Sequence, residues 1–560
     1  MNDLVKWLEV RKNLYKKAHQ EVLYRLGVDS AGFRAYEAQY RKEFQDWQIA
    51  SKEELFTAIK GAQLLLLADF HALHQSQRAQ LRILRNLPER QNIYLAVEFL
   101  FEEDQTIIDA YMLDQISERE FLEKTRWQER WGFPFHNYKV LLDWAKKRNI
   151  IVRGLNKYLT STSASTLTIR DEFAADIISD LVLSDPDSLT VVIYGDLHLA
   201  SAHIPDCLSQ RLGTSIFEKT VRVFQNSEEI YFDIAQQGLE LKTDLVSLDA
   251  RSFCLLNIPP WVKWQSYLMF LDNTSGPAIA ISEKIDFDDD SEEDEDGYEG
   301  GEADVADQVS DFVKILASDL DRPCDLDRLS VYSSQSENFF ELLVDFYDES
   351  SVRWIEQLIQ QDVSFYLPEA QCGYLARLSV NHGASLAAHY FGYGGGVYGK
   401  LLIPEKKTFL QMILQESLIY FGSKLINPKR KTPTLQDLQL ALLAQNQIDV
   451  VHSAMKIALA QKLSEMMSLR GVRVPAVESQ ELSLEGQNHL IYFLAARFLG
   501  GMLGEKLHWG YRHQEISNAE VLDWLTRVFQ ASSLSSDEYF KIVEVIDKVI
   551  LPFVSKEEVL

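Results

Sequence analysis

Short apolar runs alternate with helix-like stretches between residues 51 and 235, and this alternation constrains the fold most strongly. Strands are predicted at 63–68, 92–98, 149–155 and 189–195. Apolar residues recur at helical spacing between them, at 72–87, within 103–125, and at 137–147 and 169–184. Neighbouring parallel strands need such crossover helices. The sequence therefore predicts an α/β fold, with a parallel-core sheet flanked by helices.

A polar residue stands at or near the end of each predicted strand. His71 and His198 each complete an Asp-x-His segment, Glu98 directly follows five apolar residues, and Asn156 follows the run 150–152. Ligands of open α/β sheets bind at the carboxyl ends of the strands, which lie at one edge when the strands are parallel. We therefore predict that these four side chains meet in one crevice.

Imidazole and carboxylate groups in one crevice are typical ligands of haem iron or of a divalent metal ion. The predicted metal ligands are His71, Glu98 and His198. The predicted cofactor-binding residues are His71, His74, Asn156, His198 and His203, because His74 and His203 follow the strand-end histidines closely. The cofactor is expected to be haem or a divalent metal ion.

The same groups also suit acid–base chemistry. Glu98, Asp69 and Asp196 are the candidate catalytic carboxylates, one of which would activate a water molecule on a bound metal. Asp69 and Asp196 have an alternative role, which is to orient the neighbouring imidazole rings. A strand-end Glu98 should be buried and should need a cation or hydrogen-bond donors.

The order of these segments resembles the ChaN-like haem-binding proteins of the Tiki superfamily. The resemblance covers about residues 51–225 and rests on Ala68-Asp69-Phe70-His71, Val97-Glu98, a Trp/Pro/Phe segment before Asn137-Tyr138, residues 150–156, and Gly195-Asp196-Leu197-His198 with Ile204-Pro205 soon after. It implies a haem-binding protein with His71 and His198 as paired site histidines and Glu98 as the site glutamate. Ala68 and Asp69 depart from the glycine and glutamate usual in the family.

Two alternatives to haem or metal binding remain open. The wider superfamily includes Tiki metalloproteases and erythromycin-esterase-like enzymes, so the resemblance also implies a metal-dependent hydrolase. The departures at Ala68 and Asp69 instead favour a non-catalytic interaction scaffold whose pocket has decayed. No G-x-S-x-G or H-E-x-x-H motif supports serine hydrolysis or zincin proteolysis.

The length of 560 residues predicts more than one domain. The predicted divisions are a helical lead-in at 1–50, the α/β domain at 51–280, an acidic disordered linker at 281–305 and a helical domain at 306–560. The strand-like pieces 220–224 and 230–232 are expected to extend the sheet. The helical domain shows no fixed repeat and is a candidate surface for a protein partner.

Two motifs in the second half are predicted to carry no ligand. Gly394–Lys400 imitates phosphate-binding loops, but Leu401 stands where Ser or Thr should bind magnesium and Pro404 follows, so a flexible glycine turn is predicted. Residues 427–431 are expected to be a short exposed basic loop.

The net charge of the chain and its cysteine content indicate which partners it can bind and in which cellular compartment it functions. The formal net charge of -27 argues against nucleic acid and anionic membranes as partners. The four cysteines lie far apart with no C-x-x-C pair, and no secretory signal or stretch of ~20 apolar residues is visible. We therefore expect a cytoplasmic protein without a membrane span that binds haem or another small molecule.

Overall fold

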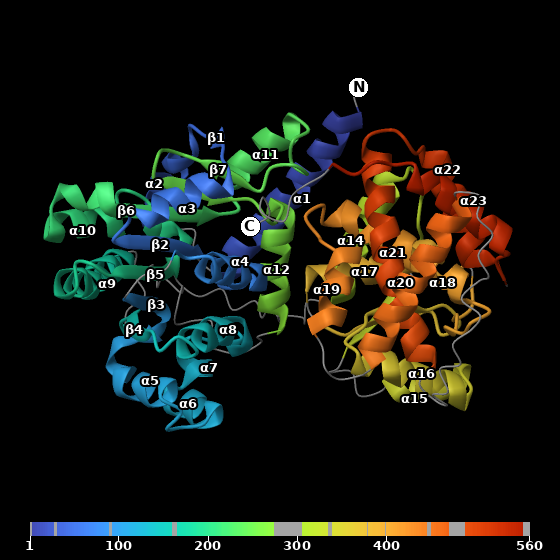
Figure 1. Cartoon of the computed structure of the whole chain (residues 1–560), viewed down its shortest axis with the longest axis horizontal. Helices are drawn as coiled ribbons and strands as arrows, with labels where there is room; N and C mark the ends of the chain where they lie inside the picture. The colour runs from blue at the N-terminus through green and yellow to red at the C-terminus, as the bar shows by residue number, and fades with distance from the viewer. Residues whose placement is uncertain are drawn as a thin grey trace, which may run out of the picture. The chain divides into compact units, whose positions relative to one another are not determined.

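The computed structural model divides the chain into two compact units, one within residues 1–301 and one within 302–553 (Figure 1). The residues whose structure is described are 3–26, 31–88, 92–159, 165–273, 305–326, 328–333, 339–377, 379–397, 399–444, 450–469, 488–531 and 533–552. The predicted acidic linker lies almost wholly outside these ranges.

An eight-stranded sheet forms the centre of the first unit. Its order is β1 (Gln48–Ile49), β7 (Leu245–Ser247), β8 (Ser252–Leu255), β6 (Thr220–Gln225), β2 (Leu64–Asp69), β5 (Leu189–Gly195), β3 (Ile93–Phe101) and β4 (Ile151–Asn156). Six neighbouring strands pair in parallel, in the order β8, β6, β2, β5, β3 and β4. At the other edge, β7 pairs antiparallel with β8 and with β1. The predicted parallel-core sheet is confirmed.

Helices cover both faces of this sheet, so its central strands are apolar on both sides. Leu65 and Leu67 of β2 belong to one apolar cluster, and Leu64, Leu66 and Ala68 belong to the other. The first cluster includes residues of α3 (Lys52–Lys60), α4 (His74–Arg85), α5 (Gln105–Met112), α6 (Glu118–Lys124), α7 (Trp127–Arg130) and α8 (Phe135–Lys146). The second includes residues of α2 (Ala31–Arg41), α9 (Ser165–Ser184), α10 (Ile204–Leu212) and α11 (Glu228–Gln236).

Two further helices of this unit pack together, α1 (Asp3–Leu26) and α12 (Pro260–Asn273). Ala18, Val22 and Leu26 of α1 form a small apolar cluster with Tyr267 and Leu268 of α12. Phe70, directly after β2, packs against this cluster. The pair α1 and α12 is thereby brought to the carboxyl end of β2.

The end of β3 departs from regular pairing. The register of β3 against β4 shifts between Val97 and Phe101, so the residues around Glu98 form an irregularity in the ladder. A Cβ at Gly154 would lie 2.7 Å from the carbonyl carbon of Phe101, so this approach of β4 to β3 requires glycine.

Residues 230–232 correct the sequence prediction, because they lie in helix α11 and not in a strand. The apolar triplet was too short to reveal its period. Ile230 and Ile234 are buried at helical spacing, and Glu228 and Glu229 occupy the first turn, where the helix dipole favours acidic residues. The neighbouring segment 220–224 does extend the sheet, as β6.

The second unit is mostly helical, as predicted, but it also contains a three-stranded sheet. Its order is β10 (Phe365–Leu367), β11 (Cys372–Leu375) and β9 (Ser330–Ser333). The helices are α14 (Val305–Asp319), α15 (Phe339–Phe346), α16 (Glu349–Gln360), α17 (Val380–Gly392), α18 (Phe409–Ile426), α19 (Leu435–Ala444), α20 (Val450–Leu469), α21 (Asn488–Arg512), α22 (Asn518–Gln530) and α23 (Ser536–Asp547). The mostly helical prediction is confirmed, and these three short strands are the part of the unit that it did not include.

The two predicted loops differ in outcome. Gly394, Gly395, Gly396 and Gly399 all have positive φ and follow the end of α17, as a glycine turn requires. The basic segment 427–431 is a loop, as predicted, but only its end is exposed: Asn427 and Lys429 are buried at 1% and 9% exposure, whereas Lys431 is exposed. Within the described residues, no helix combines the length and apolarity needed to cross a membrane.

Candidate functional site

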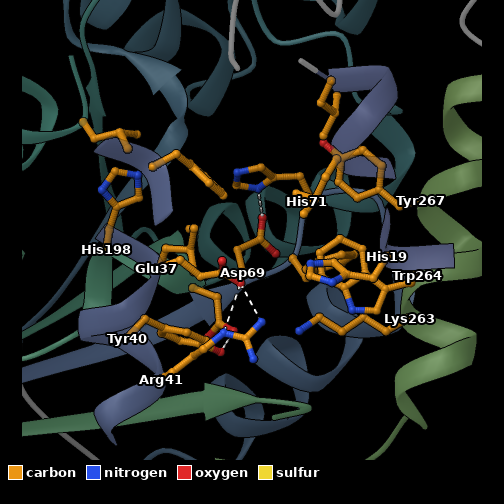
Figure 2. A pocket seen from close by; sticks show the side chains of 18 of the residues that line it. His19, Glu37, Tyr40, Arg41, Asp69, His71, His198, Lys263, Trp264 and Tyr267 are labelled. Carbon is orange, nitrogen blue, oxygen red and sulfur yellow. Dashed lines mark hydrogen bonds and ion pairs between the residues drawn. The ribbon is translucent and has the colours of Figure 1, made fainter. Parts of the chain in front are cut away.

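A cavity lies at the carboxyl edge of the large sheet, bounded by α1, α2 and α12. It encloses about 1330 Å³, part of it open to solvent. Figure 2 shows His198 on the left, His71 and Asp69 in the centre, and Lys263, Trp264 and Tyr267 of α12 on the right. His71 follows β2, and His198 lies in a 3-10 turn, η3 (Asp196–Leu199), that follows β5. Because β2 and β5 are paired parallel neighbours, both histidines reach the same cavity.

His71 is oriented by a buried carboxylate within its own segment. Its Nδ1 lies 2.8 Å from Oδ2 of Asp69, which is 3% exposed. Gln77 and Gln80 of α4 each donate a hydrogen bond to Oδ1 of that carboxylate. Burial alone would raise the pKa of Asp69, but the interactions with His71, Gln80 and Gln77 outweigh it and lower the pKa. A charged Asp69 holds the imidazole proton on Nδ1 and leaves the lone pair on Nε2.

His198 is oriented in the same way by a residue from a different element. Its Nδ1 lies 2.5 Å from Oδ1 of Asp171 in α9, a side chain that is 2% exposed. The hydroxyl of Tyr36 in α2 donates to Oδ2 of Asp171 and lies 2.8 Å from the same imidazole nitrogen. His203 stacks on Tyr36, with ring centroids 3.5 Å apart. In His198, as in His71, the Nδ1 side of the ring therefore faces a buried aspartate and Nε2 is the nitrogen on the opposite side.

Glu98 and both histidines converge on Gly195, the last residue of β5. The Gly195 amide donates a hydrogen bond of 2.6 Å to Oε2 of Glu98, and Nε2 of His71 lies 3.7 Å from the same oxygen. A Cβ at Gly195 would lie 3.2 Å from Cδ2 of His198 and 3.6 Å from Nε2 of His71. Because both distances are measured from the same point, Cδ2 of His198 and Nε2 of His71 are less than about 7 Å apart.

Ion pairs surround the part of the cavity away from His71 and His198, next to His19 of α1. Arg41 of α2 pairs with Glu37 and Glu229, at 2.8 and 2.7 Å. Lys263 of α12 pairs with Glu228 at 3.0 Å. Burial would lower the pKa of Lys263, but Glu228 and then Asp196 outweigh it, so its pKa is raised and the ammonium stays charged.

Asp196 does not orient the neighbouring imidazole, which was one of the two roles predicted for it from the sequence. Its side chain accepts a hydrogen bond from the hydroxyl of Tyr40, whereas the imidazole of His198 is held by Asp171. Burial raises the pKa of Asp196 to about 6, and the charge of Lys263 opposes that rise. The reason is local: in η3 the Asp196 side chain reaches Tyr40 of α2.

The structure brings together only part of the predicted set. Asp69, His71, Glu98, Asp196 and His198 line the cavity. His203, His74 and Asn156 do not. His203 bonds to the carbonyl of Leu197, His74 lies near His136, and the Asn156 side chain accepts from the Lys157 amide. Asn156 ends β4, which is separated from β2 and β5 by β3.

Sequence reasoning missed the residues that helices contribute. Asp171, Tyr36, Arg41, Lys263 and Trp264 belong to α2, α9 and α12, and each is one polar or aromatic residue within an ordinary helical pattern. Among these helix residues, Lys263 is unusual because it is buried together with Glu228, but the sequence does not reveal that burial. No motif marks these positions.

The arrangement can supply imidazole ligands but not a preformed metal cage. Among the described residues, no group of three or more His, Cys, Asp or Glu side chains is arranged to hold a metal ion. The predicted triad His71, Glu98 and His198 thus shares a cavity without forming such a cage. A catalytic metal ion normally takes about three protein ligands.

Comparisons with known proteins bear on one segment of the chain. No curated protein and no solved structure matches the chain. Residues 55–165 match the family model described as haem-binding uptake, Tiki superfamily, ChaN. The matched segment contains His71, Glu98 and their strands β2 and β3. Residues 55–165 are therefore similar to the ChaN family of haem-binding uptake proteins in the Tiki superfamily, and this similarity supports a haem-binding role.

Proposed function

We propose that the first unit binds haem in the cavity at the sheet edge, with His71 and His198 as its iron ligands. The observation that carries this proposal is the donor set. Three imidazole rings line one cavity, His19 of α1 and the strand-end pair His71 and His198, while the described residues offer no group of three ligands for a bare metal ion. The porphyrin supplies four nitrogen ligands, so haem iron needs only one or two from the protein.

The hydrogen bonds of the two histidines suit iron ligation. Asp69 and Asp171 each accept from Nδ1, which fixes the ring orientation and makes Nε2 a stronger donor. Bound haem would supply an iron centre whose absorbance reports its ligands. Glu98 lies beside the His71 ring, 3.7 Å from its Nε2, and accepts from the Gly195 amide, so it holds the end of β5 against β3.

The remaining lining suits a flat apolar ring that carries two carboxylates. Phe33, Phe70, Trp264 and Tyr267 provide aromatic surface, and Leu23, Leu26, Leu167 and Leu197 provide aliphatic surface. Arg41, Arg170 and Lys263 also line the cavity, and Arg41 and Lys263, which pair with glutamates there, would share their donors with the haem propionates. A mostly apolar cavity with a few placed polar groups is typical of cofactor sites.

The experiment is a hemin titration of the purified full-length protein, followed by its Soret band. We expect saturable binding of one haem per chain. His71→Ala and His198→Ala should each weaken it by about 100-fold or more, because removing a ligand should cost at least as much as removing an outer partner. His74→Ala and His136→Ala are the matched controls and should bind as the parent does, since neither side chain lines the cavity.

Two other outcomes would contradict the proposal. A stoichiometric divalent metal by elemental analysis, without a Soret band, would favour the metal-dependent hydrolase with His71, Glu98 and His198 as ligands. Absence of both haem and metal would favour the interaction scaffold. Equal loss in all four histidine variants would indicate general unfolding, which circular dichroism of each variant would show.

A further inference from the structure

The two histidines at the sheet edge are held by aspartates whose surroundings differ. Nδ1 of His71 lies 2.8 Å from Oδ2 of Asp69, and Nδ1 of His198 lies 2.5 Å from Oδ1 of Asp171. Both carboxylates are buried, so neighbouring side chains and not bulk water surround their oxygens. The hydrogen bonds that each aspartate accepts from other side chains therefore decide how strongly it attracts the proton of its imidazole.

Asp69 is surrounded by donors. Among the residues that the structure describes, four more side chains donate to it at 2.7–3.2 Å, all from α4 and α8: Ser76, Gln77 and Gln80 at Oδ1, and Tyr138 at Oδ2. A carboxylate offers about four acceptor positions, so the capacity of Asp69 is filled. Each donor draws negative charge toward itself, which leaves less for the bond to His71.

Asp171 accepts far fewer hydrogen bonds. In the described part of the chain, Tyr36 is its one side-chain donor besides His198, and it donates to the other oxygen, Oδ2. Oδ1 of Asp171 thus serves the imidazole alone, whereas Oδ2 of Asp69 is shared between His71 and Tyr138. The contact at Asp171 is also the shorter of the two, 2.5 Å against 2.8 Å, as expected for a stronger bond to a charged acceptor.

We propose that the two histidines are unequal iron ligands, with His198 the stronger and His71 the weaker. A stronger hydrogen bond at Nδ1 increases the electron density that Nε2 donates to a metal ion, so His198 would hold the iron more firmly. The proposal rests on the haem-binding function proposed above. It gives Asp171 and Asp69 unequal effects, and it makes Tyr138 a positioning residue that acts on His71 through Asp69.

The hydrogen bonds themselves can be tested without haem, by NMR of the full-length protein with 15N label only in its 12 histidines. An imidazole proton resonates at lower field when its hydrogen bond is stronger. His71→Gln and His198→Gln identify the two Nδ1 protons, because each variant removes one resonance. We expect the proton of His198 to resonate at lower field than that of His71.

Tyr138→Phe tests whether the donors around Asp69 cause the difference. It removes one donor from Oδ2, so the proton of His71 should move to lower field while the proton of His198 stays in place. Tyr111→Phe, at a buried tyrosine of the same apolar cluster, is the matched control and should move neither proton. A role of Tyr138 in packing alone would leave the His71 proton where it is in the parent.

Hemin titrations, followed at the Soret band, test the order of the two ligands. Both alanine variants lose affinity, but His198→Ala should bind hemin at least about tenfold more weakly than His71→Ala, since it removes the stronger ligand. Equal or reversed affinities, equal proton positions, or an unmoved His71 proton in Tyr138→Phe would each overturn the proposal. A parent protein without a Soret band would contradict the haem-binding function instead, and the proton positions would still show whether the two imidazoles are held unequally.

Discussion

Asp171 on α9 holds His198, which lies beyond β5, through contact of its Oδ1 with the imidazole Nδ1 at 2.5 Å. Asp171 is 2% exposed and also accepts from Tyr36, so one buried carboxylate joins α9, α2 and the turn after β5. The orientation of His198 therefore depends on the packing of two helices, and not on its own Asp-x-His segment.

Asp171→Asn should weaken haem binding by roughly 10–100-fold while leaving both histidines in place. The neutral amide cannot favour the Nδ1 proton as a carboxylate does, so Nε2 becomes a poorer ligand. A hemin titration followed at the Soret band measures the change. Asp180→Asn, at an exposed position of the same helix, should bind as the parent does, and equal affinity in both variants would rule out this role for Asp171.

Gly195→Ala should reduce haem binding more than it reduces stability. The residue has a φ of -50°, which alanine adopts without strain, but the added Cβ would lie 3.2 Å from both Glu98 and His198. These side chains must shift, and the rings they position shift with them. Hemin affinity should fall by about tenfold or more, with the unfolding free energy lowered by no more than ~1–2 kcal/mol. Parent-like affinity would mean that the three side chains do not act together.

Gly154→Ala should lower the free energy of unfolding by roughly 1–3 kcal/mol or more, because the added Cβ would meet the backbone of Phe101 at 2.7 Å. Urea denaturation of the two proteins measures the difference. Gly61→Ala is the matched control, since its nearest heavy atom would be 3.8 Å away. A parent-like midpoint for Gly154→Ala would contradict the close approach of β4 to β3.

The second unit should lose stability in mild acid through His382. Burial, with Arg430, Arg497 and Arg377 nearby, lowers its pKa to about 4, against about 6.5 in the unfolded chain. The unfolded chain then binds the proton more readily, so stability is lost as the pH falls from about 6.5 through 4. At pH 5 the lowered pKa of His382 reduces the free energy of unfolding by about 2 kcal/mol relative to pH 8.

Melting temperatures of the parent and His382→Gln at pH 8 and pH 5 check this sign. The variant loses the hydrogen bond with Ser364 at both values, but it should suffer less from the move to pH 5. His513→Gln, at an exposed histidine, should track the parent across the same range. An equal acid response in His382→Gln and the parent would show that this histidine is not responsible.

The strands of the large sheet were predictable because each is an apolar run buried on both faces. The same reasoning placed His71, Glu98 and His198 at one edge, since the polar residue ending each run is local information. Asp171 and Tyr36 escaped prediction because their roles arise from helix packing across more than 130 residues of sequence. The basic segment 427–431 was misjudged for a similar reason. Its burial depends on α17, α18 and α21, none of which its own composition reveals.

The position of β5 between β2 and β3 sets when the site can exist during synthesis. The segment that matches the haem-binding family ends at residue 165, before β5 begins at Leu189. In the complete sheet β5 separates β2 from β3, which lie two strand spacings apart, about 10 Å, and until β5 leaves the ribosome these two strands have no shared neighbour. His198 and the Gly195 amide arrive with that same strand. A nascent chain that ends before residue 189 would therefore hold His71 and Glu98 without a common cavity, and haem capture would report that the sheet has closed.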